Sequence, residues 1–299
     1  KIIGNEETYY MWKMWFWIVI LLLIAGVFAE VERELHTFCI TRYKVLLSKW
    51  NGEKSGKIIF LSDLHNHEYG LHNKKLIDKI KMENPELILI GGDILVGKEN
   101  ISYESAAKFV ESIAKIAPVY YANGNHEQRM KEKPEKYGDA FVKYKRRLLD
   151  AGVCFLENES AEVELDGNKL SLTGLELRME VYEKMKTHQV TKEDIAQKVG
   201  PANREEIQIL LAHNPEYMEA YQAWGSDITL SGHLHGGLIC LPNGKSVITP
   251  QFHLFPKHAG EMKVKGNQTA IVSRGLGTHT VNIRLFNPAE LIVFQISKQ

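Results

Sequence analysis

Hydrophobic residues are distributed along this chain in two ways, and each predicts its own kind of structure. The first is an uninterrupted apolar run over residues 14–29, preceded by Lys13 and an aromatic-rich stretch at positions 9–12. A helix needs roughly 17–25 apolar residues to span a bilayer, which this run reaches only if the aromatic stretch counts and Lys13 extends to the interface. We therefore expect residues 1–35 to be a single-pass anchor in the cell membrane, while basic residues on both flanks leave its orientation open. A signal peptide cleaved after Ala29 and a buried core helix are the alternatives.

From residue 36 onward, short apolar runs alternate with stretches of helical periodicity. The short runs predict buried strands, and apolar residues spaced three and four apart predict amphipathic helices between them. We expect an α/β fold, with residues 36–299 forming one domain because no linker or repeat interrupts the pattern. The predicted strands are residues 36–47, 57–61, 87–90, 119–122, 153–156, 161–165, 169–172, 207–211, 227–230, 270–273 and 290–296. The predicted helices are residues 71–82, 103–116, 137–151, 180–199 and a short one ending at 224, and residues 166–168 predict a hairpin turn.

Composition adds little beyond excluding one class of partner. The chain carries 37 basic and 37 acidic side chains, so it has no net charge that would favour nucleic acid. Its three cysteines lack the spacing of a metal site and are interpreted as structural thiols.

Polar motifs follow five of the apolar runs directly. In α/β folds the loops at the carboxyl ends of strands converge on one edge of the sheet, where ligands bind. Carboxylate, carboxamide and imidazole together suit borderline divalent transition metals better than calcium. Each motif alone could be a turn, a helix cap or a buried histidine, but all five in order favour a metal site. The motifs are Asp63-x-His65, Gly92-Asp93, Gly124-Asn125-His126, His213 and Gly232-His233-x-His235, and further candidates for substrate contact are His67, His253 and His258.

Taken in this order, the five motifs resemble those of the calcineurin-like metallophosphoesterase superfamily. The late motifs at residues 272–277, Arg284 and 287–290 resemble its membrane-associated branch, which includes the YkuE-type phosphodiesterases and the UDP-2,3-diacylglucosamine pyrophosphatases. The resemblance covers roughly residues 36–296. It implies a four-layer α-β-β-α metallophosphoesterase sandwich behind the N-terminal membrane helix.

The resemblance also implies a role for each motif residue. Two divalent ions, of manganese, iron or zinc, would share a hydroxide that attacks phosphorus in a phosphodiester or pyrophosphate. His126 would lie beside them as general acid or transition-state stabiliser. One metal would be held by Asp63, His65 and His235, the other by Asn125, His213 and His233, with Asp93 bridging both.

The apolar segment bears on the substrate, because an anchor confines an enzyme to the membrane surface. A lipid-linked phosphodiester or a nucleotide-sugar lipid pyrophosphate is the expected substrate class. The residues after His65 are Asn66-His67, where a small residue is common in the family, so the substrate edge is expected to differ. A non-catalytic metal-binding scaffold with the same fold is the alternative. A protein phosphatase is less favoured, because the late motifs resemble the other branch.

Overall fold

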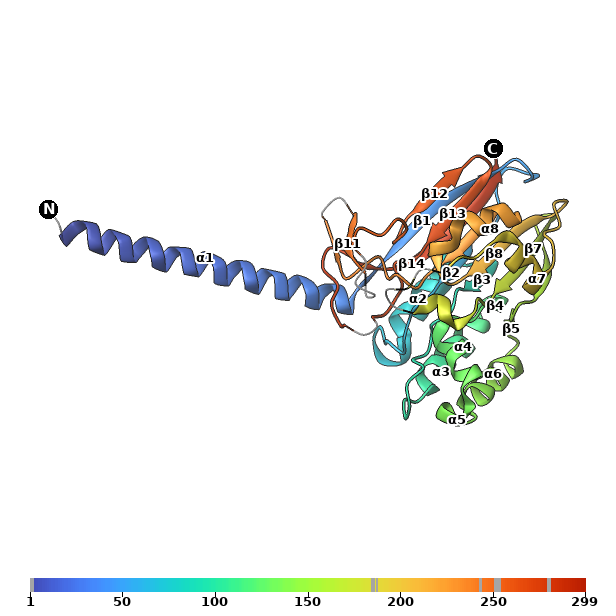
Figure 1. Cartoon of the computed structure of the whole chain (residues 1–299), viewed down its shortest axis with the longest axis horizontal. Coiled ribbons are helices and arrows are strands. Elements are labelled where there is room, and N and C mark those ends of the chain that lie inside the picture. The colour runs from blue at the N-terminus through green and yellow to red at the C-terminus, as the bar shows by residue number, and fades with distance from the viewer. Residues whose placement is uncertain (1–2, 184–185, 187, 242–243, 250–253, 279–280) are drawn as a thin grey trace.

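The computed structural model describes residues 3–183, 186, 188–241, 244–249, 254–278 and 281–299. Its first element is a single helix, α1 (Ile3–His36), which extends away from the globular part of the molecule (Figure 1). Residues Thr8–His36 are long and apolar enough to cross a membrane, and their most apolar window is not buried against the rest of the chain. The interpretation as a buried core helix is therefore wrong, whereas anchor and signal peptide both remain compatible with this helix.

Two six-stranded sheets form the centre of the globular part. In the first sheet only the β14–β2 pair is antiparallel. Its order is β1 (Phe38–Leu47), β14 (Ala289–Lys298), β2 (Ile58–Leu61), β3 (Leu87–Ile90), β4 (Val119–Tyr121) and β5 (Cys154–Phe155). The carboxyl ends of β2, β3 and β4 therefore meet at one edge, as the sequence predicts.

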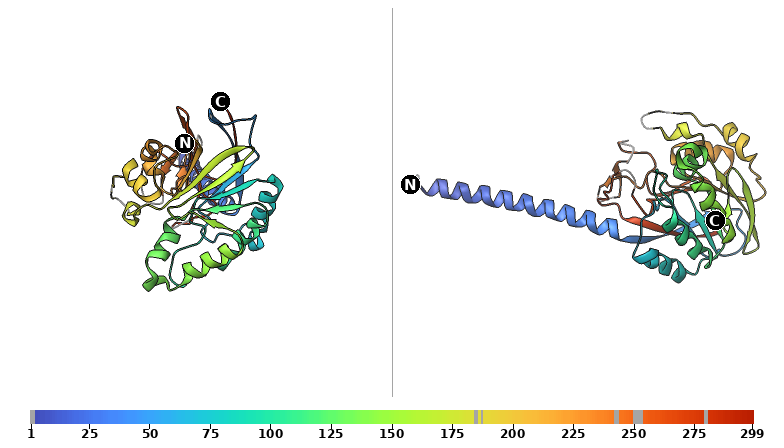
Figure 2. Two further views of the ribbon diagram at one scale, coloured as in Figure 1. Left: turned by 90° about the vertical axis from the view of Figure 1, so that its right-hand side faces the viewer. Right: turned by 90° about the horizontal axis from the view of Figure 1, so that it is seen from below.

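The second sheet has a parallel centre between two antiparallel edges. The β12–β13 and β6–β7 pairs are antiparallel, and the latter turns at the predicted Asp166-Gly167 position. Its order is β12 (Met262–Lys265), β13 (Gln268–Val272), β9 (Ile228–Ser231), β8 (Ile207–Ala212), β7 (Asn168–Leu175) and β6 (Ser160–Leu165). A separate short pair, β10 (Ile239–Cys240) and β11 (Ser246–Ile248), lies close to the end of α1 (Figures 1 and 2).

Strand side chains alternate between separate parts of the core, because successive residues of a strand point to opposite faces. In β2, Ile58 packs in a cluster with Leu172 and Ile209 of the second sheet. Its neighbour Ile59 packs instead with Ile80 and other side chains from helices. Burial on both faces explains why these strands are continuous apolar runs rather than alternating ones.

Helices contribute to two of the three core clusters. The cluster on the first sheet includes side chains of α2 (Lys74–Glu83), α3 (Glu104–Ala114) and α6 (Ala140–Asp150). The cluster on the second sheet includes side chains of α7 (Lys192–Val199) and α8 (Met218–Trp224). The remaining helical elements are α4 (Asn125–Glu132), α5 (Pro134–Tyr137), η1 (Leu71–Asn73), η2 (Met179–Tyr182) and η3 (Pro215–Tyr217).

The predicted helix over residues 180–199 is confirmed only in its second half, by α7, and is wrong in its first half. Met179–Tyr182 is a short 3₁₀ turn and α7 begins only after Thr191, while residues 184, 185 and 187 lie outside the described part. Thr191 is the physical reason, because its hydroxyl accepts a hydrogen bond from the Asp194 N–H and starts a new helix there. Helix α4 was not predicted, and it proves important to the site.

Candidate metal centre

All eight predicted site residues lie at the edge where the two sheets present their strand ends. Asp63 follows β2, Asp93 follows β3, and Asn125 and His126 open α4 after β4. His213 follows β8, while His233 and His235 follow β9. Seven of the eight are buried, and His233 is half-buried. Charged and imidazole groups at this depth need partners, because an isolated buried charge is costly.

Asp63, His65 and His235 form a first group whose ligand atoms lie within 4.8 Å of one another. Asp63 Oδ1 is 3.9 Å from His65 Nε2 and 3.5 Å from His235 Nε2. The two imidazole Nε2 atoms are 3.1 Å apart. Two nitrogens so close to a carboxylate require a shared proton or a cation between them.

Asp93, His213 and His233 form a second group of the same kind. Asp93 Oδ2 is 3.2 Å from His213 Nε2, and the His213 and His233 rings have centroids 5.3 Å apart. Asn125, predicted for this group, is buried, and its side-chain oxygen has no hydrogen-bond partner within the described residues. A buried acceptor without a donor is expected where a cation completes the site.

Asp93 stands between the two groups. Its Oδ2 lies 3.8 Å from His65 Nε2 of the first group as well as 3.2 Å from His213 Nε2 of the second. The same oxygen is 4.0 Å from His126 Nε2, and Oδ1 accepts a hydrogen bond from the His126 N–H. The Asp93 carboxylate thus faces both groups and His126, while Asp63 Oδ1 of the first group also lies 3.7 Å from His213 Nε2.

The electrostatics of the centre favour added positive charge. Burial raises the pKa of Asp63 to about 6, with His213 lowering it and Asp93 raising it further. Burial alone would lower the pKa of His213, but the charges of Asp93 and Asp63 outweigh burial and raise it to about 10. Burial would likewise raise the pKa of Asp93, yet the neighbouring imidazoles, His213 first, bring it well below its usual value. A divalent ion bound here would supply the same positive charge in place of the imidazole proton.

Backbone contacts orient the imidazoles in two opposite ways. His213 Nδ1 is 2.7 Å from the Gly91 carbonyl, and His235 Nδ1 is 3.1 Å from the Gly277 carbonyl. In the neutral rings Nδ1 is therefore the donor, and the Nε2 lone pair faces the carboxylates, as in a metal ligand. At His126 the contact is reversed, because the Gly97 N–H donates to Nδ1 at 2.7 Å. The proton of neutral His126 therefore sits on Nε2.

The loops that carry these side chains are strained. Five of the seven predicted ligands have positive φ: Asp63, His65, Asp93, His233 and His235. Left-handed backbone is uncommon for residues other than glycine and concentrates at functional sites. The adjoining glycines leave room for the carboxylates. A Cβ at Gly232 would overlap the Asp63 carboxylate, and one at Gly124 would overlap that of Asp93.

Glu127 supports the centre and was not predicted from the sequence. This fully buried carboxylate accepts hydrogen bonds from the N–H groups of Asp93 at 2.8 Å, Ile94 at 2.9 Å and Gly124 at 3.1 Å. Tyr121 also donates to it, at 2.7 Å. Burial, followed by repulsion from Asp93, raises the pKa of Glu127 to about 7. Its signal in the sequence was an acidic residue three positions after the helix N-cap.

Arg284 and Asn287, from the motifs near the end of the chain, support the backbone around His235 and around residues 274–277. Buried Arg284 donates to the carbonyls of Arg274, Gly275 and Gly277 at 2.8, 3.1 and 2.7 Å. The Asn287 side chain donates to the carbonyls of His235 and Gly237 at 2.7 and 2.6 Å. These residues hold backbone in place, a role that the sequence alone did not reveal.

The three candidates for substrate contact are not brought into the two groups. His67 packs against the Tyr69 ring at a centroid distance of 4.6 Å, and burial lowers its pKa. His258 faces Glu261 at 3.6 Å. His253 lies outside the described residues.

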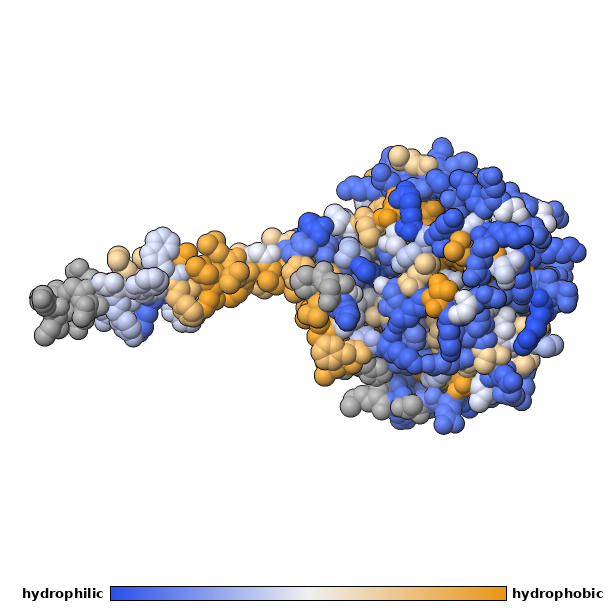
Figure 3. All heavy atoms as spheres, turned by 90° about the horizontal axis from the view of Figure 1, so that it is seen from above, coloured by the Kyte–Doolittle hydropathy of each residue, from blue (hydrophilic) through white to orange (hydrophobic). Residues whose placement is uncertain are grey.

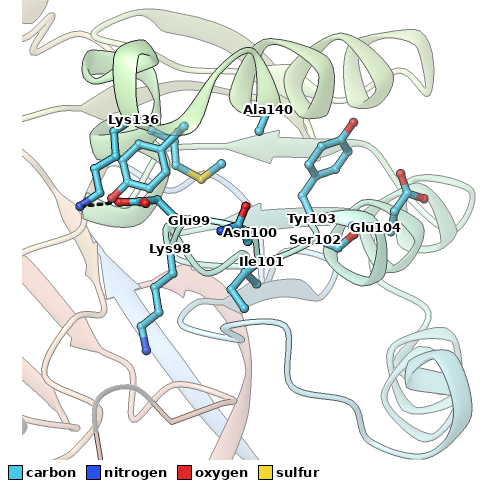
Figure 4. A pocket seen from close by; sticks show the side chains of 11 residues that line it. Lys98, Glu99, Asn100, Ile101, Ser102, Tyr103, Glu104, Lys136 and Ala140 are labelled. Atoms are coloured by element: carbon cyan, nitrogen blue, oxygen red, sulfur yellow. Dashed lines mark hydrogen bonds and ion pairs between the residues drawn. The ribbon is translucent and has the colours of Figure 1, made fainter.

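A pocket of about 520 Å³ is lined by the loop that follows Gly97 and by residues of α4 to α6 (Figure 4). Lys98, which follows the Gly97 that bonds His126, contributes to its wall, and Lys136 on the opposite side pairs with Glu99 at 3.1 Å. Tyr137 also lines it and donates to the Gly97 carbonyl at 3.3 Å.

Comparison with known proteins places the centre within a matched region. Residues 56–237 match the calcineurin-like phosphoesterase family. The Bacillus subtilis protein YpbG is 27% identical over 246 residues, which cover 80% of each chain. The metallophosphoesterase YkoQ of the same organism is 26% identical and covers 81% of this chain and 84% of its own. The phosphodiesterase YaeI of Escherichia coli is 24% identical, with coverage of 81% and 82%.

Proposed function

Because this chain belongs to the calcineurin-like phosphoesterase family, and so hydrolyses phosphoric ester bonds, we propose that it is a membrane-anchored, two-metal phosphodiesterase or pyrophosphatase. The observation that carries this proposal is the position of Asp93. Its carboxylate oxygen lies 3.8 Å from a histidine of one ligand group and 3.2 Å from a histidine of the other. A bridging carboxylate between two metal sites requires this placement.

The side chains present fit two divalent ions. Asp63, His65 and His235 would hold one, and His213, His233 and Asn125 the other, with Asp93 shared between them. The unpartnered Asn125 oxygen and the Nε2 atoms that face the carboxylates support this assignment. When bound, such ions lower the pKa of water and stabilise charge on phosphoryl oxygens. Manganese, iron and zinc all accept this mixture of ligands.

His126 is proposed as the proton donor to the leaving oxygen. The Gly97 N–H occupies its Nδ1 lone pair, so that the neutral ring presents an N–H at Nε2. That N–H lies 4.0 Å from Asp93 Oδ2, at the junction of the two groups. It can donate a hydrogen bond to a phosphoryl or leaving oxygen there, and a protonated ring could transfer its proton.

We also propose the layer arrangement of the fold, the membrane location and the class of substrate. Three core clusters, one between the sheets and two under helices, support a four-layer α-β-β-α arrangement for residues 36–299. The exposed apolar helix supports an anchor over residues 1–35 at the cell membrane. An anchor supports a lipid-linked or nucleotide-sugar-lipid substrate and the membrane-associated branch. The non-catalytic scaffold is not favoured, because all seven proposed ligands and His126 are present.

The test uses the full chain in lipid nanodiscs, first stripped of metal with a chelator. Hydrolysis of bis-p-nitrophenyl phosphate is measured before and after addition of manganese, iron or zinc, beside His126→Gln. The proposal requires metal-dependent turnover that is lost in the variant. Bound metal without turnover under every condition would leave the non-catalytic metal-binding scaffold as the better account.

A further inference from the structure

Six exposed apolar side chains lie together on one part of the globular surface. We call them the apolar loop patch. Leu254 and Phe255 are 65% and 70% exposed, and Phe286 is 46% exposed. Phe255 and Phe286 both have positive φ, an unfavourable backbone for a bulky residue. The members are Ile239, Leu241, Leu254, Phe255, Ile283 and Phe286.

Backbone hydrogen bonds join the segments that carry this patch. The Leu238 N–H donates to the Ile248 carbonyl at 2.7 Å, which pairs β10 with β11. On one side, the Phe255 N–H donates to the Val247 carbonyl at 3.0 Å. On the other side, the Cys240 N–H donates to Leu285 at 3.0 Å. Residues from three separate stretches of the chain therefore form one surface.

The patch lies beside the end of α1. Glu34, in the last turns of that helix, accepts a hydrogen bond at 2.9 Å from the N–H of Asn287, the residue after Phe286. The segments around β10 and β11 reach back alongside the helix end in two views (Figures 1 and 2). An apolar area flanks the base of the helix in the space-filling view (Figure 3).

The helix itself fixes the depth of this surface. The apolar run ends at Ala29, five residues before Glu34, and five residues of α-helix rise about 7.5 Å. The headgroup region of one leaflet is roughly 5–8 Å thick. If α1 spans the bilayer, Asn287 sits at the outer limit of the headgroups and the patch beside the helix lies within them.

We propose that the apolar loop patch is a second membrane contact, inserted among the lipid headgroups beside the anchor. This inference rests on the anchor of the proposed function. The apolar loop patch contacts the bilayer surface rather than a protein, because the patch is continuous with the base of a helix of membrane-spanning length. Asn287 also donates to the His235 and Gly237 carbonyls. The contact therefore sets the height of the metal centre above the lipid, where a lipid-linked phosphate would be presented.

Depth-dependent fluorescence quenching in the full chain tests this inference without relying on activity. Single cysteines replace Leu254, Phe286, Leu22 or Val142 in a cysteine-free background (Cys39→Ser, Cys154→Ser, Cys240→Ala) and carry an environment-sensitive fluorophore. The chains are placed in nanodiscs of phosphatidylcholine and phosphatidylglycerol, with or without a lipid that bears a doxyl quencher. The quencher is near the headgroup for positions 254, 286 and 142, and near the end of the acyl chain for position 22, which lies midway along the apolar run. Leu22 reports on the anchor. Val142, on α6 away from α1, is the matched control, because its 66% exposure equals that of Leu254 within one point.

We expect quenching of the labels at positions 254, 286 and 22. The label at position 142 should not be quenched. A quenched label at 22 with unquenched, water-like labels at 254 and 286 overturns the inference and leaves the anchor intact. Blue-shifted but unquenched labels at 254 and 286 also overturn it, because protein rather than lipid then covers the patch. An unquenched label at 22 refutes the anchor itself, and the second contact with it.

Discussion

Replacement of Glu127 by glutamine tests whether this buried carboxylate holds the metal loops in place. The change preserves size and removes one acceptor oxygen. Glu127 Oε2 accepts from the N–H groups of Asp93 and Gly124, and Oε1 accepts from those of Ile94 and Leu95 as well as from Tyr121. A glutamine –NH₂ in either orientation therefore faces two backbone donors that lose their partner.

The magnitude follows from these contacts. A buried donor left without a partner costs about 1–3 kcal/mol, so two of them cost roughly 2–6 kcal/mol in the free energy of unfolding. For a domain of this size, 1 kcal/mol corresponds to about 2–4 °C in Tm. Glu127→Gln should therefore lower the Tm by at least about 4 °C.

Thermal unfolding of the metal-stripped chain, followed by circular dichroism, measures this shift separately from any effect on metal affinity. The measurement is made at pH 8, above the pKa of about 7 that burial gives Glu127, so that the wild-type carboxylate is ionised. Glu135→Gln is the matched control, because Glu135 is exposed on α5 and its replacement should change stability by less than about 0.5 kcal/mol. Equal Tm values for the two variants would refute the role assigned to Glu127.

Three further predictions concern the proton donor, the helix junction and the metals. His126→Gln should retain bound metal but lose about 10²–10⁴-fold in turnover, and unchanged kcat would contradict the assignment of Nε2 as donor. Glu34→Leu should destabilise the globular part by about 1–3 kcal/mol, because the Asn287 N–H loses its acceptor. Glu34→Gln keeps an acceptor and should match the wild-type chain in stability. Equal denaturant midpoints for Glu34→Leu and the wild-type chain would exclude the contact. Metal removal should lower the Tm, with about 2.7 kcal/mol regained when added manganese reaches one hundred times its Kd, and a Tm independent of metal concentration would oppose a bound ion.

Much of the fold could be predicted because its signals are local. The run Leu87–Ile90 is apolar on both faces and was predicted with its observed bounds. The first half of the predicted helix over residues 180–199 was wrong, because a capping threonine at position 191 begins the helix there. Strand β12, whose side chains Lys263 and Lys265 are exposed, has no apolar run to predict it.

The site residues could be selected from the sequence because each follows a strand, and strand ends converge in α/β folds. The supporting residues could not. Glu127 accepts from the N–H groups of Asp93 and Ile94, 34 and 33 positions earlier, and Asn287 donates to carbonyls 52 and 50 positions earlier. No local pattern encodes such contacts. Glu34 lies in a segment that predicts only an anchor, yet its carboxylate bonds a residue 253 positions later. Long-range partners of this kind require the folded structure.

Metal content of the full chain tests the central claim most directly. The wild-type chain and Asp93→Ala are purified identically, loaded with manganese, and analysed by inductively coupled plasma mass spectrometry after removal of unbound ions. Because Asp93 faces both ligand groups, we expect about two ions per wild-type chain and loss of both from the variant. Full occupancy in Asp93→Ala would contradict the shared carboxylate, and with it the two-metal centre.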